Sequence, residues 1–408
     1  MTSRERVRRI FRGEGGNDFA ISVGGMPSDG MSAYAYKNLL AYLKMEDKPI
    51  RVYDLFQFLA ELDVDVINAL GGDFIPVNRM RYRFDISCKE WKQGTLNDGT
   101  PCWYPYEFNP EIREDGSKVI YMGGKPYARM PKDGLYFDII RHPLEGVDEI
   151  DDLFLTPPAV PMDEEEVDYT VKEIEKAYAN TDKSVVLIYG AWLVEQGQRD
   201  FNFEEFYCNL ATEKELMHAY FQSLVDIYIE NLEKILSRAG DKIDVVHFAD
   251  DLGTQQTLQI SVPMYREMIK PYAKQMFDYV HKNYPHIKVL LHSCGAIFDI
   301  IPDLIEIGVD LLNPVQISAK GMDPARLVKE YGKNIMFWGG GASTQQFPEI
   351  GSVEALERHV QELVEVFGRS GNYIFTQIHN FQADVPPEWI VKVYETARKY
   401  REKVTGIK

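Results

Sequence analysis

Three residues in the second half of the chain have the side chains and the spacing to bind one metal ion. His292 and Cys294 lie two residues apart, and along an extended segment such side chains point in the same direction. His379 closes a later apolar run and is the natural third ligand. Imidazole nitrogen and thiolate sulfur are ligands that Zn²⁺ prefers, and a catalytic zinc ion binds three protein ligands and keeps one position open. The pattern therefore predicts a zinc site, although a His-x-Cys pair is also compatible with purely structural roles.

Polar residues at the ends of other apolar runs could serve the same site. Asp250 and Asp251 end one run, where a carboxylate or a bound water could complete the metal shell, and where a carboxylate could also act as a general base or bind a substrate. The alternative for either aspartate is a helix cap, and we expect one functional and one structural residue. We predict catalytic roles for Asp250 and Gln316. The predicted substrate-binding residues are Asp251, Asn313, Trp338 and Asn380.

Two further features have simpler interpretations. His247 lies within an apolar run, and we expect its ring to make a hydrogen bond in the core. The glycines at 339–341 are followed by no lysine of a phosphate-binding loop and lack the spacing of a dinucleotide motif. These glycines are therefore expected to give the backbone room beside a ligand.

Eight short apolar runs, separated by amphipathic stretches, provide the frame for these residues. Runs of Val, Ile, Leu and Phe without polar alternation are typical of parallel strands covered on both faces. Strands that alternate with helices predict βα units, and eight of them predict a closed (β/α)8 TIM barrel, with a doubly wound open sheet as the alternative. Five runs turn polar at their carboxyl ends, where the active site of a barrel is built. The runs are 19–23, 73–77, 184–189, 244–249, 288–292, 309–315, 334–338 and 372–378.

One segment, at about 81–138, interrupts this alternation of strands and helices. We therefore treat 1–408 as a single barrel domain with an insertion at about 81–138. The insertion is rich in Tyr, Gly, Pro and Lys and contains turn signals, which predict one or two antiparallel hairpins after the second strand. It could be a lid, a partner interface or a structural decoration. Residues 51–54 are interpreted as a helix start. Helices are predicted at 213–238, 264–283, 297–307, 353–367 and 387–400.

Composition excludes several classes of protein. The chain has 45 Lys and Arg against 63 Asp and Glu, and the resulting net charge of −18 repels nucleic acids and anionic membranes. Four cysteines in 408 residues are too few for a disulfide framework and fit a reducing compartment. No secretory signal or membrane-length apolar run is present in the sequence. We expect a soluble cytoplasmic protein with no nucleic-acid or membrane partner.

Several motifs together resemble the uroporphyrinogen decarboxylase-like superfamily over nearly the whole chain. They are His-Ser-Cys-Gly at 292–295, Gly-Val-Asp-Leu-Leu-Asn-Pro-Val-Gln at 308–316, and Asn-Tyr-Ile-Phe followed by His-Asn at 372–380. The resemblance implies either metal-independent decarboxylation of uroporphyrinogen or zinc-dependent methyl transfer that involves corrinoid proteins. True decarboxylases carry arginines after the first strand, where residues 22–30 of this chain contain none. A tetrapyrrole with many carboxylates is therefore disfavoured as substrate.

The methyltransferase branch, which the chain resembles more closely, has His-x-Cys and a distant Cys. Here His379 stands in the place of that distant Cys. A neutral imidazole in place of a thiolate makes zinc a stronger Lewis acid, which favours activation of an ether oxygen over a thiol. The resemblance thus implies an O-demethylase type of methyltransferase, which moves a methyl group from a small methoxylated or methylated molecule to a corrinoid protein.

Two other functions stay open, a carboxy-lyase that acts on a small acid and a non-catalytic protein that binds a corrinoid or a metabolite. The oligomeric state is also open, with a homodimer as one alternative. Aromatic residues of the insertion could line a pocket for an aromatic substrate, contact the corrinoid protein, or only pack the hairpins together. These residues are Trp91, Trp103, Tyr104, Tyr106 and Phe108.

Overall fold

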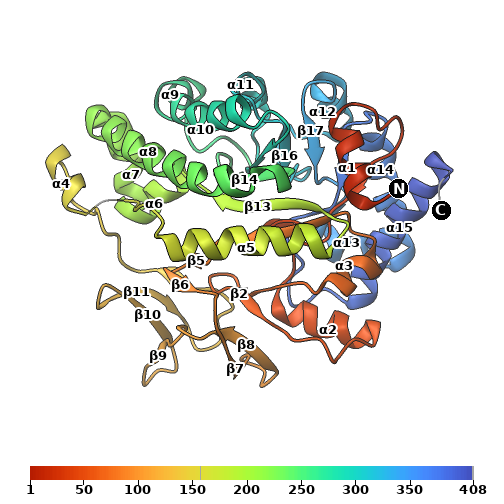
Figure 1. The fold of residues 1–408 in the computed structure, drawn as a ribbon, viewed down its shortest axis with the longest axis horizontal. Helices are drawn as coiled ribbons and strands as arrows, with labels where there is room; N and C mark the ends of the chain where they lie inside the picture. The colour runs from red at the N-terminus through yellow and green to blue at the C-terminus, as the bar shows by residue number, and fades with distance from the viewer. Residues whose placement is uncertain (157, 407–408) are drawn as a thin grey trace.

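Eight parallel strands form a barrel in the computed structural model, which describes residues 1–156 and 158–406 (Figure 1). Every strand overlaps one of the eight predicted runs, and the strands follow chain order around the sheet. This order confirms the TIM barrel and excludes the doubly wound sheet. The strands are β1 (Ala20–Ile21), β4 (Phe74–Asn78), β13 (Ser184–Gly190), β14 (Val245–Ala249), β15 (Lys288–His292), β16 (Leu311–Asn313), β17 (Met336–Trp338) and β19 (Tyr373–Phe375).

Asp73 closes the barrel between its first and second strands. Its backbone N–H donates to the carbonyl of Ile21 at 2.7 Å, and its carboxylate accepts the N–H of Ile21 at 2.9 Å. The same carboxylate, in a residue only 1% exposed, binds Arg6 at 2.9 Å and Arg401 at 2.8 Å. Arg6 belongs to α1 (Ser3–Phe11) and Arg401 to α15 (Pro387–Thr405). One buried charge therefore joins the first and last helices to the closure of the sheet.

The predicted helices are present, but two of them are divided, since residues 297–307 form a 3-10 helix (Phe298–Ile300) followed by α11 (Ile301–Glu306). Residues 264–283 form two helices, α9 (Val262–Met268) and α10 (Lys270–Asn283), instead of one. Pro271 explains the break, because proline lacks the N–H of the helical ladder and its ring collides with the carbonyl four residues earlier. The other helices that flank the strands include α2 (Ala33–Leu43), α3 (Val64–Leu70), α5 (Glu164–Asn180), α8 (Lys214–Ala239), α11 (Ile301–Glu306), α12 (Pro324–Tyr331) and α14 (Val353–Gly368).

Short helices occupy several loops. The two that follow β13 matter most for the site, because they stand at the carboxyl end of a barrel strand. The short helices are α4 (Ile150–Leu155), α6 (Val194–Phe201), α7 (Phe203–Thr212) and α13 (Phe347–Ile350).

The insertion after β4 consists of antiparallel strands, which lie together below the barrel in Figure 1. It contains two hairpins and one four-stranded sheet, so it is larger than the one or two hairpins predicted. Tyr104 and Phe108 pack against Phe58, while Tyr106 is exposed. The strands are β5 (Arg81–Arg83), β6 (Ile86–Ser87), β7 (Trp91–Thr95), β8 (Pro101–Pro105), β9 (Glu111–Ile112), β10 (Lys118–Met122), β11 (Lys125–Met130) and β12 (Asp138–Ile139).

The prediction of a helix start at 51–54 is wrong. This segment forms β2 (Val52–Asp54), which pairs with β3 (Leu59–Ala60). Val52 and Tyr53 have the branched and aromatic side chains that favour strands. The carboxylate of Asp54 accepts the N–H groups of Phe56 and Gln57, both at 2.9 Å, and so forms a turn where a helix would need a different backbone path.

All four cysteines are unpaired. Within the described residues, none of the helices combines the length and the apolar character that a membrane crossing requires.

The closure at Asp73 gives a stability prediction. Replacing Asp73 with Ala leaves Arg6 and Arg401 without their buried partner, which should destabilise the fold by about 3–5 kcal/mol. The expected result is a clear fall in the thermal unfolding midpoint measured by circular dichroism. As a control, Glu14→Ala removes an exposed ion pair with Arg12 and should leave the thermal midpoint nearly unchanged, because water screens such pairs. Equal effects of the two substitutions would contradict the assigned role of Asp73.

Candidate metal centre

The three predicted metal ligands meet at the carboxyl end of the barrel. His292 ends β15, Cys294 follows it, and His379 comes directly after the short strand β20 (Gln377–Ile378). Cys294 Sγ lies 3.4 Å from His292 Nε2, and one ligand atom from each of the three residues lies within 4.8 Å of the other two. In a tetrahedral zinc site with the usual bond lengths, donor atoms lie about 3.3–3.6 Å apart. The arrangement therefore fits a metal ion after small movements of the side chains.

A side-chain amide fixes the orientation of His292. The Nδ2 of Asn313 donates to the carbonyl of Trp338 at 2.9 Å, so its Oδ1 must face the other way. That oxygen accepts Ser28 Oγ at 2.8 Å and lies 2.6 Å from His292 Nδ1. Because Oδ1 can only accept, Nδ1 of His292 carries the proton. The lone pair is thus on Nε2, the atom beside the sulfur of Cys294.

His379 has the same arrangement with a second asparagine. Its Nδ1 lies 3.1 Å from Asn380 Oδ1, and the Nδ2 of Asn380 donates to Gln57 at 3.1 Å. Nδ1 of His379 is therefore the donor, and Nε2 is free to bind a metal. His379 has a left-handed backbone with φ of 63°, uncommon for a residue other than glycine. Burial, the largest cause, lowers the pKa of His379, which favours the neutral form of the ring that metals bind.

Asn380 also connects this histidine with the insertion. Gln382 donates to the same Oδ1 of Asn380 through its Nε2, and Tyr136 of the insertion donates its hydroxyl to Gln382. Tyr136 is partly exposed. A continuous chain of hydrogen bonds therefore runs from the surface of the insertion to His379.

The thiol of Cys294 needs a cation in order to ionise. Burial raises its pKa well above the usual range, and the carboxylates of Asp251 and Glu195 raise it further. A divalent ion bound at this point would reverse that preference, because metal binding releases the thiol proton. The chemistry of the donor set therefore agrees with its geometry.

The two neighbouring aspartates have different surroundings. Asp251 accepts the backbone N–H of Cys294 at 2.8 Å, and the same oxygen lies 3.6 Å from His292 Nε2. Asp250 points instead at the start of α6, where its carboxylate accepts the N–H groups of residues 193–195 at 3.0–3.3 Å. Asp251 is thus the carboxylate beside the candidate ligands. Asp250, which we predicted as catalytic, caps a helix, as our alternative for one of the pair proposed.

The other predicted site residues surround the centre at different depths. Gln316 accepts the N–H of Gly295 at 2.9 Å and so positions the loop that carries Cys294. Trp338 is fully buried among the interior side chains of the barrel, where its indole packs on Phe74 and donates to Asp29 at 3.1 Å. Asn313 and Asn380, predicted to bind substrate, orient the two histidines. These contacts assign positioning roles to Gln316, Asn313 and Asn380.

The glycines at 339–341 serve packing. A Cβ at Gly339 would lie 2.0 Å from the carbonyl oxygen of Pro314, so only glycine allows these two segments to approach.

The expectation of a core hydrogen bond for His247 is wrong. Its buried Nδ1 has no partner within the described part of the chain. Burial, and to a smaller extent the electrostatic effects of His292 and Arg83, lower the pKa of His247 to about 3. The ring is therefore neutral, and it lies within electrostatic reach of both the metal centre and an arginine from the insertion.

Several residues near the barrel mouth were not predicted from the sequence. Arg83 ends β5, and Trp192, Glu195 and Arg199 follow β13. Glu195 accepts the N–H of Asp251 at 3.3 Å, which connects this group with the metal centre. The alternating arginines at 79, 81 and 83, directly after the second strand, were the available signal.

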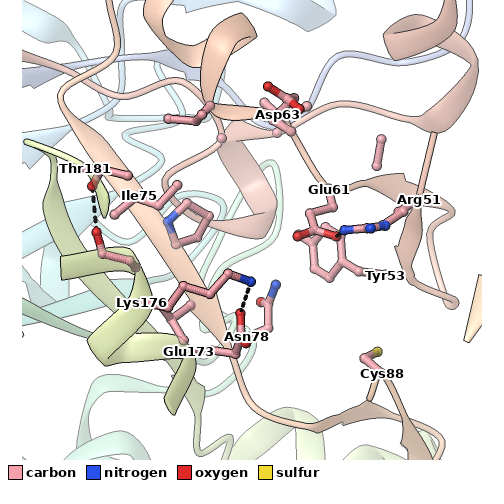
Figure 2. A pocket seen from close by; sticks show the side chains of 18 of the residues that line it. Arg51, Tyr53, Glu61, Asp63, Ile75, Asn78, Cys88, Glu173, Lys176 and Thr181 are labelled. Carbon is pink, nitrogen blue, oxygen red and sulfur yellow. Dashed lines mark hydrogen bonds and ion pairs between the residues drawn. The ribbon is translucent and has the colours of Figure 1, made fainter. Parts of the chain in front are cut away.

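A separate cavity of about 400 Å³ lies where α3 and α5 flank β4 (Figure 2). Its lining combines apolar side chains such as Ile75 with the charged side chains of Arg51, Glu61 and Lys176. Trp91 of the insertion also lines it, whereas none of the candidate metal ligands does. The cavity is therefore distinct from the metal centre.

Comparison with known proteins gives one family match. Residues 140–400 match the family described as uroporphyrinogen decarboxylase (URO-D). A search of curated proteins gave no match.

Among solved structures, a methyltransferase from Methanosarcina mazei is similar in fold, with a TM-score of 0.58 and 16% identity over 99% of both chains. Two xylanases are less similar. One, from a sugarcane soil metagenome, has a TM-score of 0.37 and 8% identity over 59% of this chain and 85% of its own. The other, from Thermotoga maritima, has a TM-score of 0.34 and 14% identity over 57% and 79%. The xylanase similarities have no bearing on function.

The asparagine beside His379 gives a prediction about metal affinity. Asn380→Ala removes the acceptor that orients the ring, which should weaken zinc binding by about 10–100-fold in competition with a chromophoric chelator. Asn380→Asp keeps an acceptor and should retain most of the affinity. The control is Asn372→Ala, since that amide binds the carbonyl of Gly332 at the other end of β19. Unchanged zinc affinity in Asn380→Ala would show that the ring needs no such support.

Proposed function

The chain belongs to the uroporphyrinogen decarboxylase family, and on that premise we propose that it is a zinc-dependent methyltransferase of the O-demethylase type. Its substrates would be a small methoxylated or methylated molecule and a corrinoid protein that receives the methyl group. The observation that carries the proposal is the convergence of His292, Cys294 and His379, with both rings held in the metal-binding tautomer. The similarity in fold to a methyltransferase agrees with it.

The reaction moves a methyl group without its bonding electrons. The bond between the methyl carbon and the substrate oxygen breaks, and its electron pair stays on oxygen. The methyl carbon forms its new bond with the electron pair of the reduced cobalt on the partner protein. When bound, Zn²⁺ acts as a Lewis acid that polarises the substrate oxygen and so makes it a better leaving group.

The residues of this chain hold and shield that centre. His292, Cys294 and His379 supply the donor atoms, and a set with one thiolate leaves more positive charge on the metal than a set with two. Asp251 lies beside the ligands, where its carboxylate can orient the substrate or occupy the fourth position. Asp250 and Gln316 act indirectly, because they position α6 and the Cys294 loop.

The insertion offers a contact surface for the corrinoid protein. Several of its large hydrophobic side chains, and those next to it, are exposed, although burial is the usual fate of such residues. The hydrogen bonds from Tyr136 to His379 connect this surface with the metal centre. The exposed side chains are Tyr106, Ile112, Tyr121, Leu135, Tyr136 and Ile140. The cytoplasmic location and the homodimer stay predictions.

The experiment is elemental analysis combined with a methyl-transfer assay. We expect about one zinc ion per chain in the purified protein, lost in Cys294→Ala and in His379→Ala. Cys208→Ala is the matched control, because this exposed thiol is remote from the three ligands in the chain and should not affect zinc content. With reduced cobalamin and a set of methoxylated compounds, the zinc-loaded protein should form methylcobalamin and Cys294→Ala should not.

Protein that contains no metal, and takes up none when zinc is added, would contradict the proposal. That result would leave a metal-free carboxy-lyase or a binding protein, which release of carbon dioxide from small acids would distinguish.

A further inference from the structure

Arg83 reaches from the insertion back to the mouth of the barrel. Its guanidinium carbon lies 4.7 Å from the ring centre of Tyr82 and 5.1 Å from that of Trp192. Tyr82 packs in the cluster of side chains inside the barrel, and Trp192 comes two residues after β13. The charge is therefore placed beside the carboxyl ends of the second and third strands, where barrels bind their substrates.

The position of this arginine is fixed from one side. Its Nε donates to Asp54 Oδ2 at 3.1 Å, and Asp54 is 0% exposed. The other oxygen of Asp54 is itself held by two backbone N–H groups. With its side chain only 16% exposed, Arg83 has lost most of its conformational freedom before any ligand arrives. A ligand that binds it needs to order little more.

The outer edge of the same guanidinium is free. Within the described residues, Nη1 donates to no acceptor, and Nη2 has only a contact of 3.5 Å with the hydroxyl of Tyr82. A guanidinium carries five N–H donors in a planar fork, and this fork matches the two oxygens of a carboxylate. A bound carboxylate would supply the two acceptors that the protein itself does not offer to this edge.

The charged groups around Arg83 form two ion pairs, Arg83 with Asp54 and Arg199 with Glu195. Glu195 and Asp54 are negative, and Arg199, whose guanidinium carbon lies 4.8 Å from the ring centre of Trp192, pairs with Glu195. On the side of the barrel interior stands His247, which has an unpartnered buried nitrogen and is influenced by both Arg83 and His292. Glu195, which pairs with Arg199, also accepts the N–H of Asp251 at 3.3 Å and so connects this side of the mouth with the candidate metal ligands.

From this geometry we propose that Arg83 is an anion-binding subsite, and that the methyl donor is a small molecule whose carboxylate binds there. The role of the bound molecule as methyl donor rests on the function proposed above, whereas the subsite itself does not. The carboxylate serves only to bind and orient the methyl donor, and it remains on the demethylated product. Its methoxy or methylated end faces His292, Cys294 and His379, and a neutral compound of the same shape leaves Arg83 without an acceptor.

The first test is binding of two matched probes to the zinc-loaded protein. Calorimetric titration should give at least about tenfold tighter binding of 4-methoxybenzoate than of 4-methoxybenzamide, the difference that a charge-assisted hydrogen bond provides. Arg83→Gln should abolish this preference, and Arg83→Lys should retain only part of it, because a lysine lacks the planar fork. Methoxyacetate and methoxyacetamide provide a shorter pair for the same comparison.

The control is Arg81→Gln, on the same strand. Arg81 pairs with Asp163 and Glu166 and not with Asp54, so its loss should leave the preference for the acid unchanged. If Arg83 only ties the insertion to Asp54, Arg83→Gln will lower the thermal midpoint while the probes bind as before. That result, equal binding of acid and amide by the unchanged protein, or no binding of either acid would overturn the subsite.

Failure of the subsite and failure of the proposed function give different results. His379→Ala should still prefer the acid, because the subsite does not use the metal. Acid binding without methylcobalamin formation would reject the methyltransferase and keep the subsite. Equal kcat/KM for methyl transfer from 4-methoxybenzoate and 4-methoxybenzamide would do the reverse. Release of carbon dioxide from the bound acid would overturn the role of the carboxylate as a group that only binds and orients.

Discussion

The buried carboxylate of Asp73 joins the two ends of the sheet, and the arrangement of the site depends on that closure. Because the barrel is closed, the carboxyl ends of strands that are distant in the sequence face one mouth. His292 and His379 are separated by 87 residues, yet their ring centres lie 6.1 Å apart. The ion pairs of Asp73 with Arg6 and Arg401 also attach the first and last helices to this closure. The barrel can therefore hold three donor atoms near one point. Most of the chain contributes to the site only by fixing the positions of the carboxyl ends of the strands.

The two metal-binding histidines are positioned by the same device, an asparagine whose own donor is already used. Asn313 is committed to Trp338 and Asn380 to Gln57, so each amide oxygen faces a ring nitrogen that must carry the proton. The chemistry of the centre is thus set by neutral hydrogen bonds, which leave the charge of the metal to be balanced by Cys294 and nearby carboxylates. Asp251, beside the ligands, and Asp250, turned towards α6, show how adjacent identical residues acquire separate roles directly after a strand ends at Ala249.

Continuous apolar runs and their polar ends were sufficient to predict the barrel and the meeting of His292, Cys294 and His379. Those features depend on local pattern and on chain order, both of which a sequence displays. His247 was misjudged because an apolar neighbourhood predicts burial but gives no information about hydrogen-bond partners. Arg83 was missed because arginines were sought only after the first strand, and the path of a hairpin back over the mouth depends on contacts with Tyr82 and Trp192 that no spacing reveals. Similarly, the turn at Asp54 depends on its side chain accepting two backbone N–H groups.

The hydrogen bonds from Tyr136 through Gln382 and Asn380 to His379 have a mechanical meaning. Each hydrogen bond in this series restricts the orientation of the next side chain. The series therefore couples the position of Tyr136 at the surface to the orientation of the His379 ring. Binding of a partner protein at Tyr136 is therefore coupled to binding at the metal centre. Such a coupling free energy is reciprocal, so each binding event changes the affinity of the other by the same factor. Metal binding at His379 would then reduce the mobility of the surface around Tyr136. Contact of a partner with that surface would in turn fix the orientation of the His379 ring.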